Sequence, residues 1–139
     1  MEDNPNDLRL ALHALEIHGF KIVHVARDGA EALEYLFGNS NGKPSNGEIP
    51  TAVLLDLKLP KVDGLEVLRR MKSDPRTHDI PVVIFTSSNQ ERDIADCYGA
   101  GANSYVVKPV DFDQFTDAIR DLGEYWLHLN HPPAERRAS

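Results

Sequence analysis

Asp56 follows a wholly apolar run, residues 51–55, which has the length and composition of a strand buried on both faces. Open parallel sheets place ligands and chemistry just beyond the carboxyl ends of their strands. A carboxylate where such a strand leaves the core is costly unless it has a partner or a chemical role. The alternative is a structural aspartate that caps the following turn. This run alone does not separate the two interpretations.

Further polar groups stand at comparable positions along the chain. Glu2 and Asp3 precede the first helical pattern, and Thr86 and Lys108 each follow an apolar run. Each has a simple explanation by itself: a solvated terminal pair, a helix cap, a surface ion pair. Because the carboxyl ends of parallel strands meet at one edge of a sheet, we expect all of them to converge on Asp56.

Such a cluster suits one kind of chemistry. Three carboxylates repel one another and require a hard cation, and oxygen ligands suit Mg²⁺. A lysine and a hydroxyl beside that cation supply the counter-charge and the hydrogen bond that phosphoryl oxygens need. The residues therefore predict a site for a phosphoryl group and a magnesium ion.

The elements that must position these residues alternate regularly. Strand-like runs cover residues 20–26, 51–55, 81–85 and 104–107, and a polar loop covers residues 38–50. Helical patterns cover a stripe of leucines ending near residue 19, then residues 30–37, 64–72, 91–98 and 111–126. Alternation of this kind predicts parallel strands joined by right-handed crossovers, hence one α/β domain.

The start of the chain departs from this alternation. It opens on an acidic cluster and a helical pattern, with no strand ahead of them. An α/β unit that begins in this way either lacks its first strand or is an incomplete record of the chain.

Composition narrows the function classes. A chain of 139 residues suits one domain, and its net charge of −7 disfavours direct binding to nucleic acid. No apolar stretch approaches the roughly 18 residues of a membrane span. The single cysteine, Cys97, rules out an internal disulfide, is compatible with a reducing cytoplasm, and is expected to be an inert, partly buried thiol.

Taken together, the motifs resemble the response-regulator receiver domain, the phosphoacceptor half of two-component signalling. The resemblance runs from Glu2 to about Leu127. It rests on Glu2-Asp3-Asn4-Pro5 with Asp7, Leu55-Asp56-Leu57-Lys58-Leu59-Pro60 with Asp63-Gly64, Phe85-Thr86-Ser87-Ser88, and Lys108-Pro109.

The resemblance implies a role for each acidic residue. Asp56 would be the phosphorylated aspartate, and Glu2 and Asp3 would be the acidic pair that holds Mg²⁺. The backbone carbonyl of Lys58 would be a further metal ligand. The protein would accept a phosphoryl group from a sensor histidine kinase and assist its own phosphorylation and dephosphorylation, without being an enzyme that acts on an external substrate.

The resemblance also implies a switch. Thr86 would be the hydroxyl that turns toward the phosphoryl group, and Lys108 would be its ion-pair partner. Tyr105 matches the aromatic position whose ring turns inward when Thr86 moves. Members of the family often have a cis peptide bond before the proline that matches Pro109.

The fold implied by the resemblance is a flavodoxin-like, doubly wound parallel sheet with strand order 2-1-3-4-5. Strand 1 would lie between residues 20–26 and 51–55, and this is the strand that the sequence lacks. The receiver domain would cover residues 1–127, and residues 128–139 would form a flexible tail.

Some details resemble the small single-domain regulators that serve bacterial and cyanobacterial phytochromes. They are the long loop over residues 38–50, the stretch from Asp74-Pro75 to Ile80-Pro81, and the terminal Tyr125-Trp126-Leu127. The partner would then be a phytochrome kinase. We also expect a homodimer through the last helix and the strand over 104–107. Tyr125, Leu127 and Leu129 lie off the apolar helix stripe that must cover the sheet, which consists of Phe112, Phe115, Ile119, Leu122 and Trp126.

Three other kinds of protein share part of this pattern. Phosphatases with an aspartyl-phosphate intermediate usually carry a second aspartate two residues on, where this chain has Lys58. A flavodoxin needs a phosphate loop rich in Ser, Thr and Gly, where this chain has Asn4-Pro5-Asn6-Asp7. The remaining alternative is a receiver-like module that binds a protein partner without being phosphorylated, which the absent strand leaves open.

Overall fold

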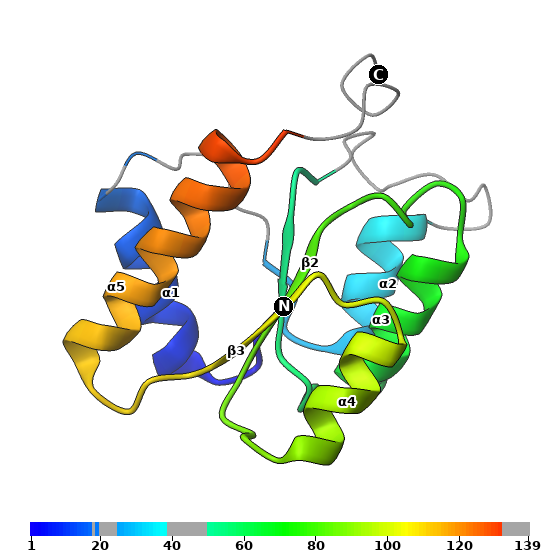
Figure 1. The fold of residues 1–139 in the computed structure, drawn as a ribbon, viewed down its shortest axis with the longest axis horizontal. Helices are drawn as coiled ribbons and strands as arrows, with labels where there is room; N and C mark the ends of the chain where they lie inside the picture. The colour runs from blue at the N-terminus through cyan, green and yellow to red at the C-terminus, as the bar shows by residue number, and fades with distance from the viewer. Residues whose placement is uncertain (18, 20–24, 39–49, 132–139) are drawn as a thin grey trace.

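The computed structural model describes residues 1–17, 19, 25–38 and 50–131 (Figure 1). From residue 29 onward, helices and strands alternate as the sequence predicts. In chain order the elements are α1 (Pro5–Ile17), α2 (Gly29–Phe37), β1 (Val53–Leu55), α3 (Gly64–Ser73), β2 (Val82–Thr86), α4 (Glu91–Gly99), β3 (Ser104–Val107), α5 (Phe112–Gly123) and a π-helical turn, η1 (Glu124–Leu129).

The three strands form one parallel sheet in the order β1-β2-β3. Leu55 of β1 pairs with Ile84 of β2, and Thr86 of β2 pairs with Val107 of β3. Their carboxyl ends therefore lie at the same edge, which confirms the predicted parallel arrangement. The order matches that expected for the last three strands of the fold, and the order of the first two remains a prediction.

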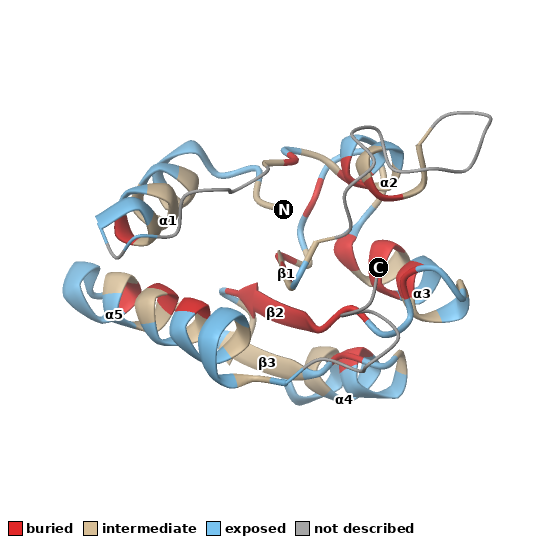
Figure 2. Cartoon of the chain, turned by 90° about the horizontal axis from the view of Figure 1, so that it is seen from above, coloured by how far each residue is buried: buried red, intermediate tan, exposed pale blue. Residues whose placement is uncertain are grey.

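Helices cover the sheet on both sides (Figure 1). Helices α1 and α5 lie together on one side, and α2, α3 and α4 lie on the other. Each helix has a buried face toward the sheet and an exposed face away from it, as the burial colours of Figure 2 show. All five residues of β2 are buried, as expected for a central strand covered on both faces.

The last helix follows most of its predicted stripe. Phe115 and Ile119 are buried, and the Phe115 ring meets the ring of Phe85 edge-on with centroids 5.2 Å apart. Phe112, which we expected on the same buried stripe, is 56% exposed. The reason is its position: it is the first residue of α5, one turn ahead of the part that packs on β2. The helical segment continues to Leu129, two residues beyond the predicted domain boundary.

Two of the predicted strands are not fully seen in the structure. The strand predicted over 51–55 pairs only over Val53–Leu55, and most of the strand predicted over 20–26 lies outside the described residues. Val25 and Ala26 are described and are not in a strand. Across the described ranges, no helix is both long and apolar enough to cross a membrane.

Candidate functional site

Asp56 is the first residue after β1 and is only 6% exposed. Gly64, at the start of α3, lies directly against its backbone: a Cβ at that position would come within 2.2 Å of the Asp56 carbonyl oxygen. Only glycine permits this approach, which places the amino end of α3 beside the carboxyl end of β1. The motif Asp63-Gly64 thus holds Asp56 where the strand leaves the core.

Lys108 binds three carboxylates at once. Its Nζ atom lies 2.8 Å from Asp56 Oδ2, 2.8 Å from Asp7 Oδ2 and 2.6 Å from Glu2 Oε2. The Lys108 side chain is only 8% exposed. The residue follows β3 directly, so the predicted convergence of strand ends brings this cation into the acidic cluster.

These contacts change the ionisation of the site. Burial opposes the charged form of Lys108, but its hydrogen bonds to the three carboxylates outweigh this effect and raise the pKa of its ammonium. Burial likewise opposes ionisation of Asp56, but the hydrogen bond and charge of Lys108 outweigh it and lower the pKa of Asp56. Burial is the dominant effect at Glu2 and raises its pKa.

Glu2, Asp3 and Asp56 could together hold a cation. One carboxylate oxygen from each lies within 4.8 Å of the other two. Bonds of about 2.1 Å to Mg²⁺ place two ligand oxygens at most about 4.2 Å apart, so only a small inward movement is needed. This oxygen-only set fits a hard divalent cation, which would compete with Lys108 for Glu2 and Asp56.

Thr86 closes β2 and carries an unusual hydroxyl. The residue is completely buried, and among the described residues its Oγ1 has no hydrogen-bond partner. Leaving a buried hydroxyl without a partner costs about 1–3 kcal/mol. Strand register puts Thr86 one residue beyond the level of Asp56, so this unused donor lies at the same edge of the sheet.

Tyr105 is joined to the loop that follows Thr86. Its hydroxyl donates to the Ser88 carbonyl at 2.9 Å, and its half-buried ring packs against the main apolar core. The Ser88 hydroxyl in turn donates to Asp93 Oδ2 at 2.5 Å, in the first turn of α4. Hydrogen bonds therefore link Tyr105 to α4 through the loop that carries Ser88.

Asp7 belongs to this site, although in the sequence it stands out only as part of a motif. Asn4 Oδ1 accepts from the backbone N–H groups of Asn6 and Asp7, which starts α1 and places Asp7 in its first turn. An acidic residue in the first turn of a helix that begins beside the strand ends was the available signal.

Lys58 and Pro109 lie at the rim of the site. The Lys58 backbone N–H donates to Asp56 Oδ1 at 3.2 Å, while its side chain is exposed. Its role as a carbonyl ligand remains a prediction. The peptide bond between Lys108 and Pro109 is trans, so the cis bond expected from the resemblance is absent here. Lys108 reaches the carboxylates without it.

Comparisons with known proteins agree on one family. Residues 1–120 match the family described as "Response regulator receiver domain". The chain is 40% identical over 134 residues to the probable methanogenesis regulatory protein FilR2 of Methanothrix harundinacea, covering 96% of this chain and 84% of that protein. It is 34% identical over 137 residues to the response regulator Rcp1 of Synechocystis sp., covering 96% and 90%.

Solved structures give the same result. The Mn²⁺-bound form of Rcp1 superposes with a TM-score of 0.87 at 32% identity, covering 96% of both chains. The phosphorylated cyanobacterial phytochrome response regulator RcpA gives 0.88 at 38% identity, covering 96% of this chain and 95% of that one. The bacteriophytochrome response regulator AtBRR gives 0.70 at 53% identity, covering 94% of both.

Proposed function

Because the chain belongs to the response regulator receiver domain family, we propose that it is a single-domain response regulator that accepts a phosphoryl group on Asp56. The donor is a phosphohistidine of a sensor kinase. Receiver domains are phosphoacceptors rather than enzymes with an external substrate. The observation that carries the proposal is the convergence of Asp56, Lys108 and the oxygens of Glu2 and Asp3 at one edge of the sheet.

Asp56 is the nucleophile in this proposal. Its lowered pKa keeps the carboxylate ionised at neutral pH. A carboxylate oxygen forms the new bond to phosphorus while the phosphorus–nitrogen bond of the donor breaks, and the released imidazole takes a proton from solvent. The Lys58 backbone N–H and the Lys108 ammonium, both bonded to Asp56 in the structure, orient the attacking carboxylate.

Glu2 and Asp3, with Asp56 and the Lys58 carbonyl, would hold Mg²⁺. A divalent cation bound there would offset the charge of the carboxylates and of the incoming phosphoryl oxygens. Lys108 keeps Asp7 as a partner when Glu2 and Asp56 turn to the cation, so the lysine stays beside the phosphoryl group.

Thr86 and Tyr105 would change position when Asp56 is phosphorylated. Thr86 Oγ1 has no geometric hydrogen-bond partner among the described residues, although it is close enough to Asp56 to help lower the pKa of that carboxyl. Phosphoryl oxygens on Asp56 would give the hydroxyl a full hydrogen bond and reduce its desolvation cost. Movement of Thr86 would displace the loop that carries Ser88, and thereby the Tyr105 ring and the start of α4.

The direct test is chemical labelling. The protein is incubated with acetyl phosphate and Mg²⁺, and the mass of the intact protein is followed by mass spectrometry. We expect the wild type to gain one phosphoryl group and Asp56→Asn to gain none. Asp113→Asn serves as the control, because Asp113 is an exposed aspartate in the first turn of α5.

Two outcomes would overturn the proposal. Labelling of Asp56→Asn at the wild-type rate would remove Asp56 as the acceptor. A wild type that never gains mass while it binds a protein partner would favour a phosphorylation-independent interaction module.

The partner that we propose is a phytochrome-type sensor kinase, which would place the protein in the cytoplasm. Support comes from RcpA and AtBRR, whose names describe them as phytochrome and bacteriophytochrome response regulators. The test is phosphoryl transfer from purified, labelled kinases, comparing a phytochrome kinase with an unrelated sensor kinase. Equal transfer rates from both would contradict this pairing.

We also propose a homodimer built from the last helical segment and β3. Tyr125, Leu127 and Leu129 of the last helical segment are 49%, 41% and 63% exposed, and Val107 of β3, near the other end of α5, is 40% exposed. Light scattering of the wild type and of Leu127→Glu, at matched high concentration, tests it. A monomeric mass for the wild type, with and without acetyl phosphate, would refute the dimer.

A further inference from the structure

Gly29, the first residue of α2, lies directly against the loop that follows Asp56. Its N–H donates to the Pro60 carbonyl at 3.0 Å. A Cβ on Gly29 would come within 1.7 Å of the Val62 carbonyl oxygen and 2.7 Å of the Val62 Cβ. Every other residue carries a Cβ, so only glycine permits this approach. The start of α2 therefore packs backbone against backbone on the loop.

The loop makes a strained turn at this contact. The Val62 N–H also donates to the Pro60 carbonyl, at 2.8 Å, so this oxygen accepts from the loop and from α2 at once. Lys61, between them, has a φ of 69°, a left-handed conformation that is uncommon for a residue other than glycine. A bond between residues two apart around such a φ is the pattern of a γ-turn, which is strained by itself. A turn of this kind persists only where surrounding contacts hold it, and the Gly29 N–H supplies one of them.

The Lys58 backbone belongs to the same short loop. Behind it, the Leu57 carbonyl accepts from the N–H groups of Leu59 and Gly64, at 3.2 and 2.9 Å. Ahead of it, Pro60 is bonded to α2. Because only two residues separate Leu57 from Pro60, a shift of Pro60 must move the Lys58 carbonyl, which is the cation ligand that we propose.

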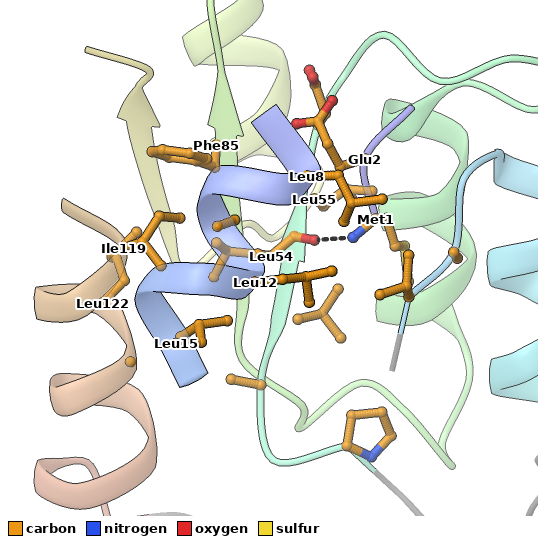
Figure 3. A pocket seen from close by; sticks show the side chains of 18 of the residues that line it. Met1, Glu2, Leu8, Leu12, Leu15, Leu54, Leu55, Phe85, Ile119 and Leu122 are labelled. Carbon is orange, nitrogen blue, oxygen red and sulfur yellow. Dashed lines mark hydrogen bonds between the residues drawn. The ribbon is translucent and has the colours of Figure 1, made fainter. Parts of the chain in front are cut away.

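The same segment of the chain also contacts the acidic pair. Three residues ahead of Gly29, the Ala26 carbonyl accepts from the Glu2 N–H at 3.0 Å. Glu2 stands beside β1, where the amino group of the preceding residue bonds to Leu54 (Figure 3). Residues 26–29 are therefore bonded to Glu2 at one end and to the loop after Asp56 at the other. These are the two parts of the chain that would supply ligands to the cation.

We propose that Gly29 is a positioning residue for the divalent cation: it holds the loop so that the Lys58 carbonyl stays in place relative to the acidic pair. The inference rests on the cation site proposed above and names the part of the fold that sets its affinity. The support is stiff, because it spans only four residues and the Asp28 side chain caps α2 by accepting from the Glu31 N–H at 2.8 Å. Ligands that are ordered before the cation arrives bind it more tightly.

Two matched substitutions test the affinity. Gly29→Ala adds a methyl group that must displace either the loop or the start of α2. Gly99→Ala adds the same group at the end of α4, where a Cβ would meet nothing within 4 Å. Isothermal titration of each folded chain with Mg²⁺ measures the dissociation constant. We expect Gly29→Ala to raise it at least about tenfold, as is typical of residues that support metal ligands, and Gly99→Ala to stay within about twofold of the wild type.

The Mg²⁺ dependence of labelling separates positioning from a general loss of fold. Labelling by acetyl phosphate is followed by mass as the Mg²⁺ concentration rises. Gly29→Ala should need at least about tenfold more Mg²⁺ to reach half of its maximal rate, and that maximal rate should stay within about threefold of the wild type. A lower maximal rate with an unchanged Mg²⁺ requirement would mean that Gly29 supports only the fold, and would overturn the proposal.

Hydrogen exchange of the wild type tests the same link without a substitution. Because coupling between two sites is reciprocal, a cation that fixes the Lys58 carbonyl should also protect the Gly29 N–H that is bonded to Pro60. We expect saturating Mg²⁺ to slow exchange of the Gly29 amide at least about threefold. Exchange of the Ala100 amide, which donates to the Asp96 carbonyl at the end of α4, should not change.

The outcomes separate this inference from the proposed function. Equal Mg²⁺ affinity of Gly29→Ala and the wild type, or unchanged exchange of the Gly29 amide, would overturn the positioning role even if Asp56 is labelled. A wild type that binds Mg²⁺ with the expected dependence on Gly29, yet gains no phosphoryl group, would support the positioning role and contradict the phosphoacceptor role.

Discussion

Asp7 and Lys108 are 101 positions apart in the chain, and their charged atoms lie 2.8 Å from each other. The aspartate comes from the first turn of α1 and the lysine from the end of β3. Asp7 is the one carboxylate bonded to Lys108 that we assign neither to the cation nor to the phosphoryl group. Asp7 therefore holds Lys108 in place when Glu2 and Asp56 change partners.

Asp7→Asn should weaken the fold and the site together. Lys108 would retain two carboxylates, so we expect the loss in unfolding free energy to be about 1–2 kcal/mol, below the 3–5 kcal/mol typical of a fully buried pair that loses one partner. Urea denaturation measures this change. Asp113→Asn, a first-turn aspartate of α5, should stay within about 0.5 kcal/mol of the wild type. An unchanged stability for Asp7→Asn would show that the contact contributes nothing.

Thr86→Val should separate stability from signalling. Valine has nearly the shape of threonine and removes a buried hydroxyl that lacks a partner, so we expect the unphosphorylated protein to gain about 1 kcal/mol. The variant should also lose the further stabilisation that phosphorylation gives the wild type. Thermal unfolding with and without acetyl phosphate measures both. A clear loss of stability in the unphosphorylated variant would mean that the hydroxyl has a partner in solution.

Removal of the divalent cation should stop phosphorylation. Without it the incoming phosphoryl group meets the carboxylates of Glu2, Asp3 and Asp56, whose charge Lys108 offsets in part. Excess chelator should abolish labelling by acetyl phosphate, and Asp3→Ala should weaken Mg²⁺ binding about tenfold or more, equivalent to about 1.4 kcal/mol. Isothermal titration measures the affinity, with Asp113→Ala as the control. Labelling that continues at full rate in chelator would contradict the assigned cation.

Acid should lower the unfolding free energy of the wild type more than that of Asp56→Asn. The pKa of Asp56 is lowered in the folded protein, so between that value and about 3.9 the unfolded chain binds more protons. The stability from ionised Asp56 is then complete above about pH 5 and is lost as the pH falls through the folded pKa. Urea denaturation in chelator from pH 7 to pH 2 measures this effect. Below about pH 4, the unfolding free energy of the wild type should fall more than that of the variant. If the unfolding free energies of the two proteins had the same pH dependence, ionisation of Asp56 would not stabilise the fold.

Local sequence determined the residues that carry the chemistry. Asp56, Thr86 and Lys108 each follow an apolar run, and a parallel sheet brings the ends of such runs to one edge whatever the details of packing. The last helix starts at Asp111 as predicted, because a cap depends on three or four neighbouring residues: the Asp111 side chain accepts from the Gln114 N–H.

Tertiary structure alone decided how these parts meet. The bond between Asp7 and Lys108 depends on the height and rotation of α1 against the sheet, which no local pattern encodes. The exposure of Phe112 depends on where α5 first touches β2. The hydrogen bond from the Met1 amino group to the Leu54 carbonyl likewise joins residues 53 positions apart. Strand ends and caps follow from neighbours in sequence, whereas shared partners follow from contacts between residues distant in sequence.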